Sequence, residues 1–224
     1  DALERWLTLK LDTGEDITVV VERLLREGYS AAVISVLVNV AKYRPSLLTG
    51  ELAPLLTFPD LYYWDSVRVA QIGTKFVGWS WARGGQGIFD FARNWALAPH
   101  RQQKFLDVVI GLLLAEDEVA RRLQALVPTW ILPEDPKERL EFKQIYASLD
   151  RANYRTVTDP ENGAEAWSFV CPDDLKLEVQ LWQSQKVRPL TYLLMPDRCE
   201  QQLQGGQVLT EEEAAYLYDL VKTC

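Results

Sequence analysis

One short stretch of this 224-residue chain contains the residue types of a proteolytic centre. Asp12, Thr13 and Gly14 match the triplet that carries the catalytic carboxylate of aspartic proteases. That chemistry needs two carboxylates that share one proton, and the sequence has no second D-T-G or D-S-G triplet. We therefore interpret the triplet as a helix cap followed by a turn, with Thr13 capping a helix whose third position is Asp16.

Two glycine-containing stretches superficially resemble nucleotide-binding loops. Gly73-Thr74-Lys75 resembles the end of a phosphate-binding loop, but Thr74 separates the glycine from the lysine, so the G-x-x-x-x-G-K-[ST] pattern is absent. Gly84-Gly85-Gln86-Gly87 lacks the strand-then-helix context of a dinucleotide site. Both stretches are predicted to be flexible turns, and we expect no ATP binding and no other cofactor in this segment.

The single histidine and the three cysteines restrict metal and nucleophile chemistry. His100 is the only histidine, which excludes zinc sites that use two histidines and forces any Ser-His-Asp triad to use this residue. Because it follows Pro99 at an expected helix start, we predict a solvent-facing or capping role for His100. Cys171, Cys199 and Cys224 lack C-x-x-C spacing, so we interpret them as reduced thiols and expect no zinc.

Tryptophan is unusually frequent, with eight in the chain. Trp79, Trp81 and Trp95 are close in sequence, with Arg83 and Arg101 nearby. Large aromatic side chains fill the space between helices, and they also anchor protein interfaces. If these tryptophans are exposed, Trp79, Trp81, Arg83, Trp95 and Arg101 form the candidate surface for a protein partner; otherwise they pack in the core.

Composition and charge restrict the class of protein. Hydrophobic residues make up 48% of the chain and charged residues 25%, which is typical of a globular protein. The net charge of −8 argues against broad nucleic-acid binding, because phosphate backbones attract basic surfaces. The most apolar window, Ala31–Ala41, is shorter than the roughly 20 residues of a membrane span. No secretory signal is visible and no initiator Met is present, so we expect a cytoplasmic fragment of a longer protein, without a membrane partner.

Helices are the elements expected to position these residues. Apolar residues recur at intervals of three and four along 17–25, which gives that helix one apolar face. A second helix, capped by Ser30 and running to about Tyr43, is apolar all round, so we expect it to be packed on both sides. Acidic clusters at 116–118, 134–135 and 211–213 mark further helix starts, where the helix dipole favours negative charge.

These segments predict a mainly all-α fold, arranged as an irregular α-solenoid or another multi-helix array. No exact repeat period is present, and a degenerate HEAT-like array is one form that the prediction allows. Prolines at 133 and 136 predict a boundary between a helical array at 1–132 and a second helical subdomain at 133–224. In the second subdomain, the turn Asp159–Gly163 predicts a short β-hairpin near 155–170.

Several stretches resemble the helical region that follows the ATPase module in very large bacterial NTPases of the STAND (NACHT-like) class. The longest, Gly28–Asp65, reads GYSAAVISVLVNVAKYRPSLLTGELAPLLTFPDLYYWD. The others are Asn94-Trp95 with Pro99-His100-Arg101, the run Leu149–Tyr154, and Phe169–Leu175. The resemblance covers most of the chain and depends on packing and turn patterns, without catalytic signatures.

The resemblance implies a sensor or scaffold beside a nucleotide switch, in a class of which several members act in bacterial defence against phage. No residue here matches the phosphate-binding loop or its acidic partner. No catalytic residue is therefore carried over, and ATP would bind a part of the parent protein outside this chain. The implied partner is a protein, either the parent's own ATPase module or another protein.

A non-catalytic scaffold is expected to have a broad exposed aromatic patch. Two other functions stay open beside it. An enzyme without a recognisable motif would need a deep cleft with convergent acids whose pKa values are perturbed. A nucleic-acid-contacting helical domain would use Arg83, Arg93 and Arg101 with nearby aromatic side chains, and its binding would fall steeply with salt.

Overall fold

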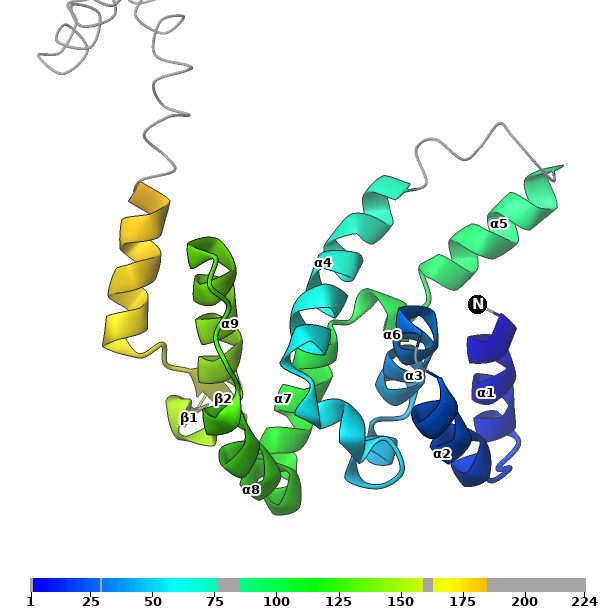
Figure 1. Ribbon diagram of the computed structural model, residues 1–224, viewed down its shortest axis with the longest axis horizontal. Coiled ribbons are helices and arrows are strands. Elements are labelled where there is room, and N and C mark those ends of the chain that lie inside the picture. Colours follow the sequence, from blue (N-terminus) through cyan, green and yellow to red (C-terminus); the bar gives the residue numbers. More distant parts are fainter. Residues whose placement is uncertain (1, 29, 76–84, 159–162, 185–224) are drawn as a thin grey trace, which may run out of the picture. The chain divides into compact units, whose positions relative to one another are not determined.

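The computed structural model describes residues 2–28, 30–75, 85–158 and 163–184. Helices hold 75% of the interpretable residues, and a short antiparallel hairpin accompanies them, so the predicted mainly α-helical fold with a hairpin is confirmed (Figure 1). None of the described helices combines the length and the apolar character needed to cross a membrane. The elements are α1 (Ala2–Asp12), α2 (Thr18–Glu27), α3 (Ala31–Tyr43), η1 (Pro45–Thr49), η2 (Ala53–Thr57), α4 (Pro59–Lys75), α5 (Gly85–Ala96), α6 (Pro99–Gln102), α7 (Phe105–Ala115), α8 (Asp117–Leu126), η3 (Val127–Thr129), α9 (Pro136–Ser148), η4 (Arg151–Asn153), β1 (Tyr154–Thr158) and β2 (Glu165–Phe169), where η denotes a 3-10 helix.

The chain divides into two compact units, Asp1–Cys171 and Pro172–Cys224. This boundary does not coincide with the predicted division at 132/133. Helix α9 follows that position but packs on α4 within the first unit, where the ring centroids of Tyr63 and Phe142 are 5.6 Å apart. The proline-marked stretch therefore forms the turn into α9, whose start is capped by Asp135. In the second unit the structure describes one helix, at 173–184.

Helix α3 is enclosed by several neighbouring helices of the first unit. Its start is set by Ser30, whose Oγ accepts hydrogen bonds from the backbone N–H groups of Ala32 and Val33, as the sequence predicts. Residues 37–42 are buried on every side of the helix, because α1, α2, α6 and α7 all contact it. Two of these six buried residues, Asn39 and Lys42, are polar.

The D-T-G triplet ends one helix and does not start the next. The Thr13 hydroxyl donates a hydrogen bond to the Lys10 carbonyl (3.0 Å) in the last turn of α1. Gly14 follows with a φ of +74°, a conformation that favours glycine. The prediction that Thr13 caps the following helix is wrong, because α2 begins only at Thr18, whose N–H donates to the Asp16 carboxylate.

Two stretches predicted to be flexible turns are helical. Gly73–Lys75 forms the end of α4, and Gly85–Gly87 forms the first turn of α5. The turn prediction is wrong at both places, because each glycine costs a helix only about 1 kcal/mol, which an otherwise favourable helix tolerates. Gly84 lies outside the described residues.

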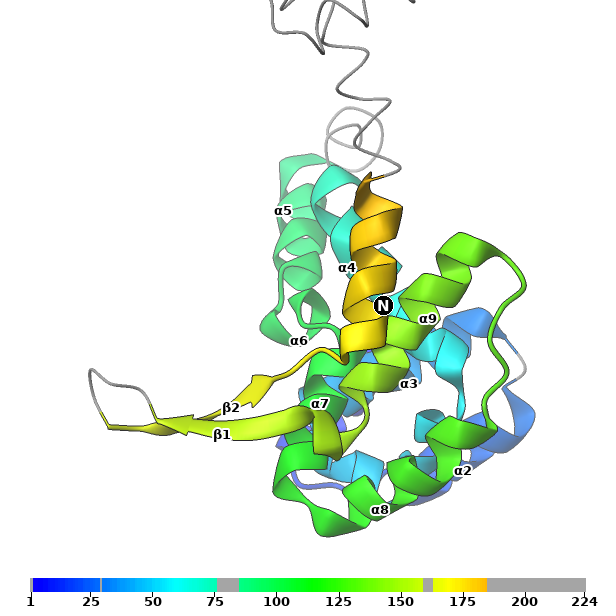
Figure 2. The ribbon, with the colours of Figure 1, turned by 90° about the vertical axis from the view of Figure 1, so that its left-hand side faces the viewer.

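Strands β1 and β2 pair in antiparallel register from Tyr154 with Phe169 to Thr158 with Glu165. The rings of Tyr154 and Phe169 lie 5.4 Å apart, and the Tyr154 hydroxyl donates to the carbonyl of Ser148 at the end of α9. Figure 2 shows the strands extending away from the helices of the first unit. The hairpin is therefore anchored at one end and exposed along most of its length.

The enclosed position of α3 generates a prediction about stability. Leu37 is fully buried in α3, whereas Val19 of α2 is exposed. We expect Leu37→Asp to lower the free energy of unfolding by at least about 4 kcal/mol, because it places an unpaired charge in the core and removes an apolar side chain. Urea unfolding followed by circular dichroism measures this loss. Val19→Asp is the matched control, with an expected change below about 1 kcal/mol, and equal effects of the two substitutions would refute the core assignment.

Candidate functional site

The structure describes two of the five residues of the predicted partner surface. Trp79, Trp81 and Arg83 lie outside the described residues. Trp95 of α5 and Arg101 of α6 lie together, with the guanidinium carbon of Arg101 5.7 Å from the centroid of the Trp95 ring. Both side chains are partly buried. The exposed part of this surface must therefore include residues of other helices.

Trp95 lines an apolar groove between α1 and α5, which we call the α1/α5 groove. Its volume is about 370 Å³. Three of its large side chains are exposed to solvent, to 42% for Trp6, 53% for Leu9 and 50% for Phe91. The complete lining is Ala2, Arg5, Trp6, Leu9, Phe91 and Trp95. Exposed aromatic side chains gathered in this way are typical of protein contact surfaces.

Cations lie over the other two aromatic rings of the α1/α5 groove as well. The guanidinium carbon of Arg5 is 4.9 Å from the centroid of the Phe91 ring, and the ammonium of Lys10 is 5.1 Å from that of Trp6. Lys10 also pairs with Glu15. Such cation–π contacts hold long side chains over the rings and order the rim of the groove.

The sequence analysis did not assign Trp6, Leu9 or Phe91 to the partner surface. Part of the signal was local, because Trp6 and Leu9 are three positions apart while Leu7 and Leu11 turn inward on the same helix. The approach of α1 to α5, however, is a tertiary contact between segments that are distant in sequence, and no local pattern encodes it.

On the inward side of α1, the side chain of Glu4 is almost completely buried. Its Oε1 accepts a hydrogen bond from His100 Nε2 at 3.1 Å and lies 3.3 Å from Nε of Arg101. Its Oε2 accepts a hydrogen bond from Asn39 Nδ2 at 3.1 Å. Both carboxylate oxygens are therefore occupied, and they tie α1 to α3 and α6.

Asp65 of α4 is the second buried carboxylate of this region. Its Oδ1 accepts hydrogen bonds from Lys42 Nζ at 2.9 Å and from Arg68 Nη2 at 2.8 Å. Its Oδ2 accepts from the backbone N–H of Phe105 at 2.7 Å. Lys42 also donates to the carbonyl of Gln103 at 3.1 Å. Asp65 therefore joins α4 to α3 and to the start of α7.

Asn39 connects the two carboxylates into one network. Its Nδ2 donates to Glu4, and its Oδ1 accepts from Arg68 Nη2 at 3.1 Å. The predicted solvent-facing or capping role of His100 is wrong, because its side chain is only 8% exposed and its ring is bound to Glu4. We call the following residues the buried polar network: Glu4, Asn39, Lys42, Asp65, Arg68, His100 and Arg101.

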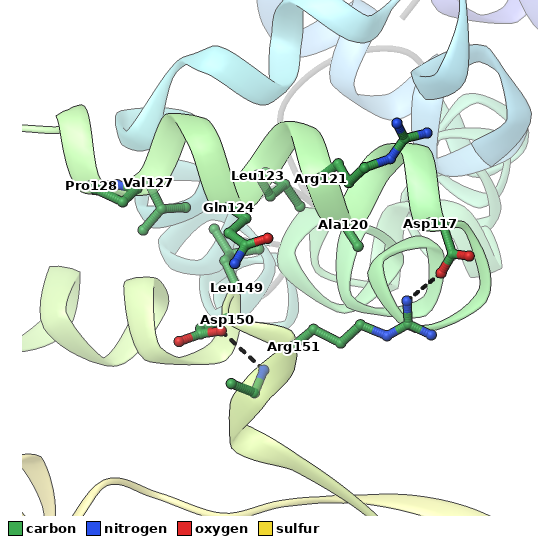
Figure 3. A pocket seen from close by; sticks show the side chains of 11 residues that line it. Asp117, Ala120, Arg121, Leu123, Gln124, Val127, Pro128, Leu149, Asp150 and Arg151 are labelled. Atoms are coloured by element: carbon green, nitrogen blue, oxygen red, sulfur yellow. Dashed lines mark hydrogen bonds and ion pairs between the residues drawn. The ribbon is translucent and has the colours of Figure 1, made fainter.

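A second cleft, of about 540 Å³, lies between α8 and η4 (Figure 3). At one end Arg151 donates to Asp117 at 2.5 Å, and elsewhere in the cleft Asp150 accepts from the backbone N–H of Ala152 at 3.0 Å. These contacts attach η4 to α8 and cap the start of η4. The charged residues around this cleft thus have structural partners and do not form a convergent acidic site.

No metal centre is formed by the described residues, since none of their His, Cys, Asp and Glu side chains gather in a group of three or more suited to an ion. No protein-family model matches the chain, and no curated protein matches it either.

The environment of Glu4 generates a prediction about acid stability. Burial alone would raise the pKa of Glu4, but the hydrogen bond from His100, the charge of Arg101 and the hydrogen bond from Asn39 together hold it below the usual 4.5. A lowered pKa in the folded chain means that ionised Glu4 stabilises the fold above about pH 4.5. This contribution is lost as the pH falls below that value.

We therefore expect Glu4→Gln to lower the free energy of unfolding by about 3 kcal/mol at pH 7, because it breaks a buried ion pair. The loss should be smaller at pH 3.5, where part of the contribution is already absent. Urea unfolding at both pH values measures the difference, with Glu22→Gln, on the exposed side of α2, as the control. An identical loss at the two pH values would contradict the assigned role of the Glu4 charge.

Lys42 generates a second prediction about pH, in the alkaline range. Burial lowers the pKa of Lys42 from 10.5 to about 8, although the charge of Asp65 acts against this change. Between these values the unfolded chain binds more protons, so the free energy of unfolding should rise with pH by up to about 1.4 kcal/mol per unit. Urea unfolding at pH 8 and pH 9.5 measures this rise in the free energy of unfolding. Lys42→Met should remove the rise, whereas Lys104→Met, at an exposed position, should retain it. A Lys42→Met variant with the original slope would exclude Lys42 as the cause.

Proposed function

We propose that this chain is a non-catalytic helical scaffold or sensor segment of a larger bacterial NTPase, and that the α1/α5 groove makes its protein–protein or intramolecular contacts. The observation that supports this best is that Trp6, Phe91 and Trp95 gather around one open apolar groove. Aromatic anchors of this kind supply most of the binding energy at protein interfaces.

The NTPase parent, its cytoplasmic location and its role in defence against phage are proposed on the family resemblance alone. In this proposal the partner is the parent's ATPase module or another protein. The motifs of the chain do not supply a nucleotide site, so the nucleotide would act through the partner, and this segment would transmit or receive a change in contact.

The positions of the acidic groups favour a scaffold over an enzyme with a motif-less acidic site. A general base needs a carboxylate lone pair that faces a substrate. Every carboxylate oxygen of Glu4 and Asp65 already accepts a hydrogen bond from a neighbouring helix. These two buried acids therefore support the helix arrangement and provide little support for catalysis.

The cations near the groove give less support to a nucleic-acid interface. Aromatic rings with nearby cations do stack bases in some proteins. Here Lys10 pairs with Glu15, Arg101 pairs with Glu4, and the chain carries a net charge of −8. Few cations of the groove are thus available to neutralise phosphates, which is what nucleic-acid affinity depends on.

Removal of the aromatic anchors tests the proposed function. Trp6→Ala combined with Phe91→Ala should weaken the complex with the partner by at least about 30-fold, since loss of an anchoring aromatic side chain costs about 2 kcal/mol. Proteins cross-linked to the tagged chain in its host are identified by mass spectrometry, and affinities of the purified pair are measured by calorimetry. Ile131→Ala is the control, since Ile131 is exposed and apolar but does not line the groove.

Two outcomes would count against the proposed function. One is a partner whose affinity is the same for the groove variant and the control. The other is substrate turnover by the chain alone that is lost in an Asp65→Asn variant shown to be folded by circular dichroism, because a scaffold has no catalytic use for that carboxylate.

A further inference from the structure

We infer that a second surface, between α3 and α4, receives a helix of a protein partner that carries an acidic and a basic residue two turns apart. A groove of about 550 Å³ lies at this surface, which we call the α3/α4 groove. None of the residues that line it lines the α1/α5 groove. The inference therefore concerns a separate site and goes beyond the proposed function.

One wall of the α3/α4 groove comes from the first half of α3. Ala31, Ile34, Ser35 and Val38 line it at positions i, i+3, i+4 and i+7, which places them on one face of the helix. Val38 is buried, whereas Ala31, Ile34 and Ser35 lie in the less buried part of the helix. The small side chains of Ala31 and Ser35 leave room for the backbone of another element to approach closely.

The other wall comes from α4, which presents a negative charge, an aromatic ring and a positive charge in line. Asp60, Trp64 and Arg68 all line the groove and follow one another at one-turn spacing. Trp64 is 62% exposed. Asp60 is exposed and forms no ion pair with another described residue. Arg68 donates to Asp65 and Asn39 through Nε and Nη2, while its Nη1 donates to none of the described residues.

The buried polar network fixes these walls before any partner binds. Lys42 of α3 bonds Asp65 of α4, and Asn39 of α3 bonds Arg68 of α4. The guanidinium group of Arg68 is thus held in one orientation by three hydrogen bonds. A cation that is already ordered loses less conformational entropy when it binds a carboxylate of a partner.

Charge complementarity identifies the occupant as an amphipathic helix. A helix lying along α4 with its N-terminal end at Arg68 would place an acidic residue there, an apolar side chain against Trp64, and a basic residue at Asp60. The two charges of the partner are then eight residues, or about 12 Å, apart. Acid near the N-terminus and base near the C-terminus also suit the dipole of the partner helix, and apolar grooves commonly bind such helices.

Two synthetic helical peptides of about 18 residues test the inference with the full 224-residue chain. Both have the same apolar face; one carries Glu eight residues before Lys, and the other has these two residues exchanged. The exchanged peptide can form the same two ion pairs only by running the other way, with both charges against its own helix dipole. Fluorescence anisotropy should therefore show that the Glu-first peptide binds about three- to tenfold more tightly. Asp60→Lys should reduce this preference, because it turns one attraction into a repulsion.

Matched variants locate the binding on α4. Trp64→Ala, shown to be folded by circular dichroism, should lower the affinity for the Glu-first peptide by at least about tenfold. Trp167→Ala, at another exposed tryptophan, and the Trp6→Ala/Phe91→Ala variant should leave the affinity unchanged. The last comparison separates this inference from the proposed function, which concerns the α1/α5 groove alone.

Four results would overturn the inference. They are no binding of either peptide, equal binding of the two peptides, binding that survives Trp64→Ala, and dimerisation of the chain that depends on Trp64 in sedimentation velocity. The last result would mean that a second copy of the chain, and not a helix of another protein, occupies the α3/α4 groove.

Discussion

Two buried carboxylates, Glu4 and Asp65, determine how the helices of the first unit are arranged. A buried carboxylate is very costly unless hydrogen bonds meet its oxygens, so each helix that supplies a donor must stay in place. For Glu4 these helices are α3 and α6, and for Asp65 they are α3, α4 and the start of α7. Apolar side chains tolerate several packings, and we interpret the network as the feature that selects one of them.

The same network also shapes the surface that is left for recognition. Arg101 binds Glu4 on one side and covers Trp95 on the other, so it connects the network to the α1/α5 groove. Arg68 binds Asp65 and lines the α3/α4 groove. Exposed aromatic side chains are available for recognition at both grooves, and Asp60 and Arg68 add charge at the α3/α4 groove. This division of roles is consistent with the proposed binding of a protein partner.

Local signals predicted much of the fold, because they act within one or two turns of a helix. Ser30 caps α3, Pro136 starts α9, and β1 and β2 form the hairpin expected near 155–170. Glu4 and His100, in contrast, are 96 positions apart and meet only through tertiary packing. In the sequence each looks like an ordinary polar residue near a helix start. For the candidate site, the grouping of Trp95 with Arg101 was foreseeable, because they are six positions apart, whereas the contribution of α1 was not.

The bond between Asp65 and Phe105 has a consequence for the order of folding. Helix α7 has no side-chain cap from its own neighbour, Lys104, and its first N–H is accepted by a carboxylate 40 positions earlier. The start of α7 is therefore completed only when α4 has docked, which couples the two segments cooperatively. Since a chain leaves the ribosome N-terminus first, the acceptor on α4 is already present when the donor on α7 emerges.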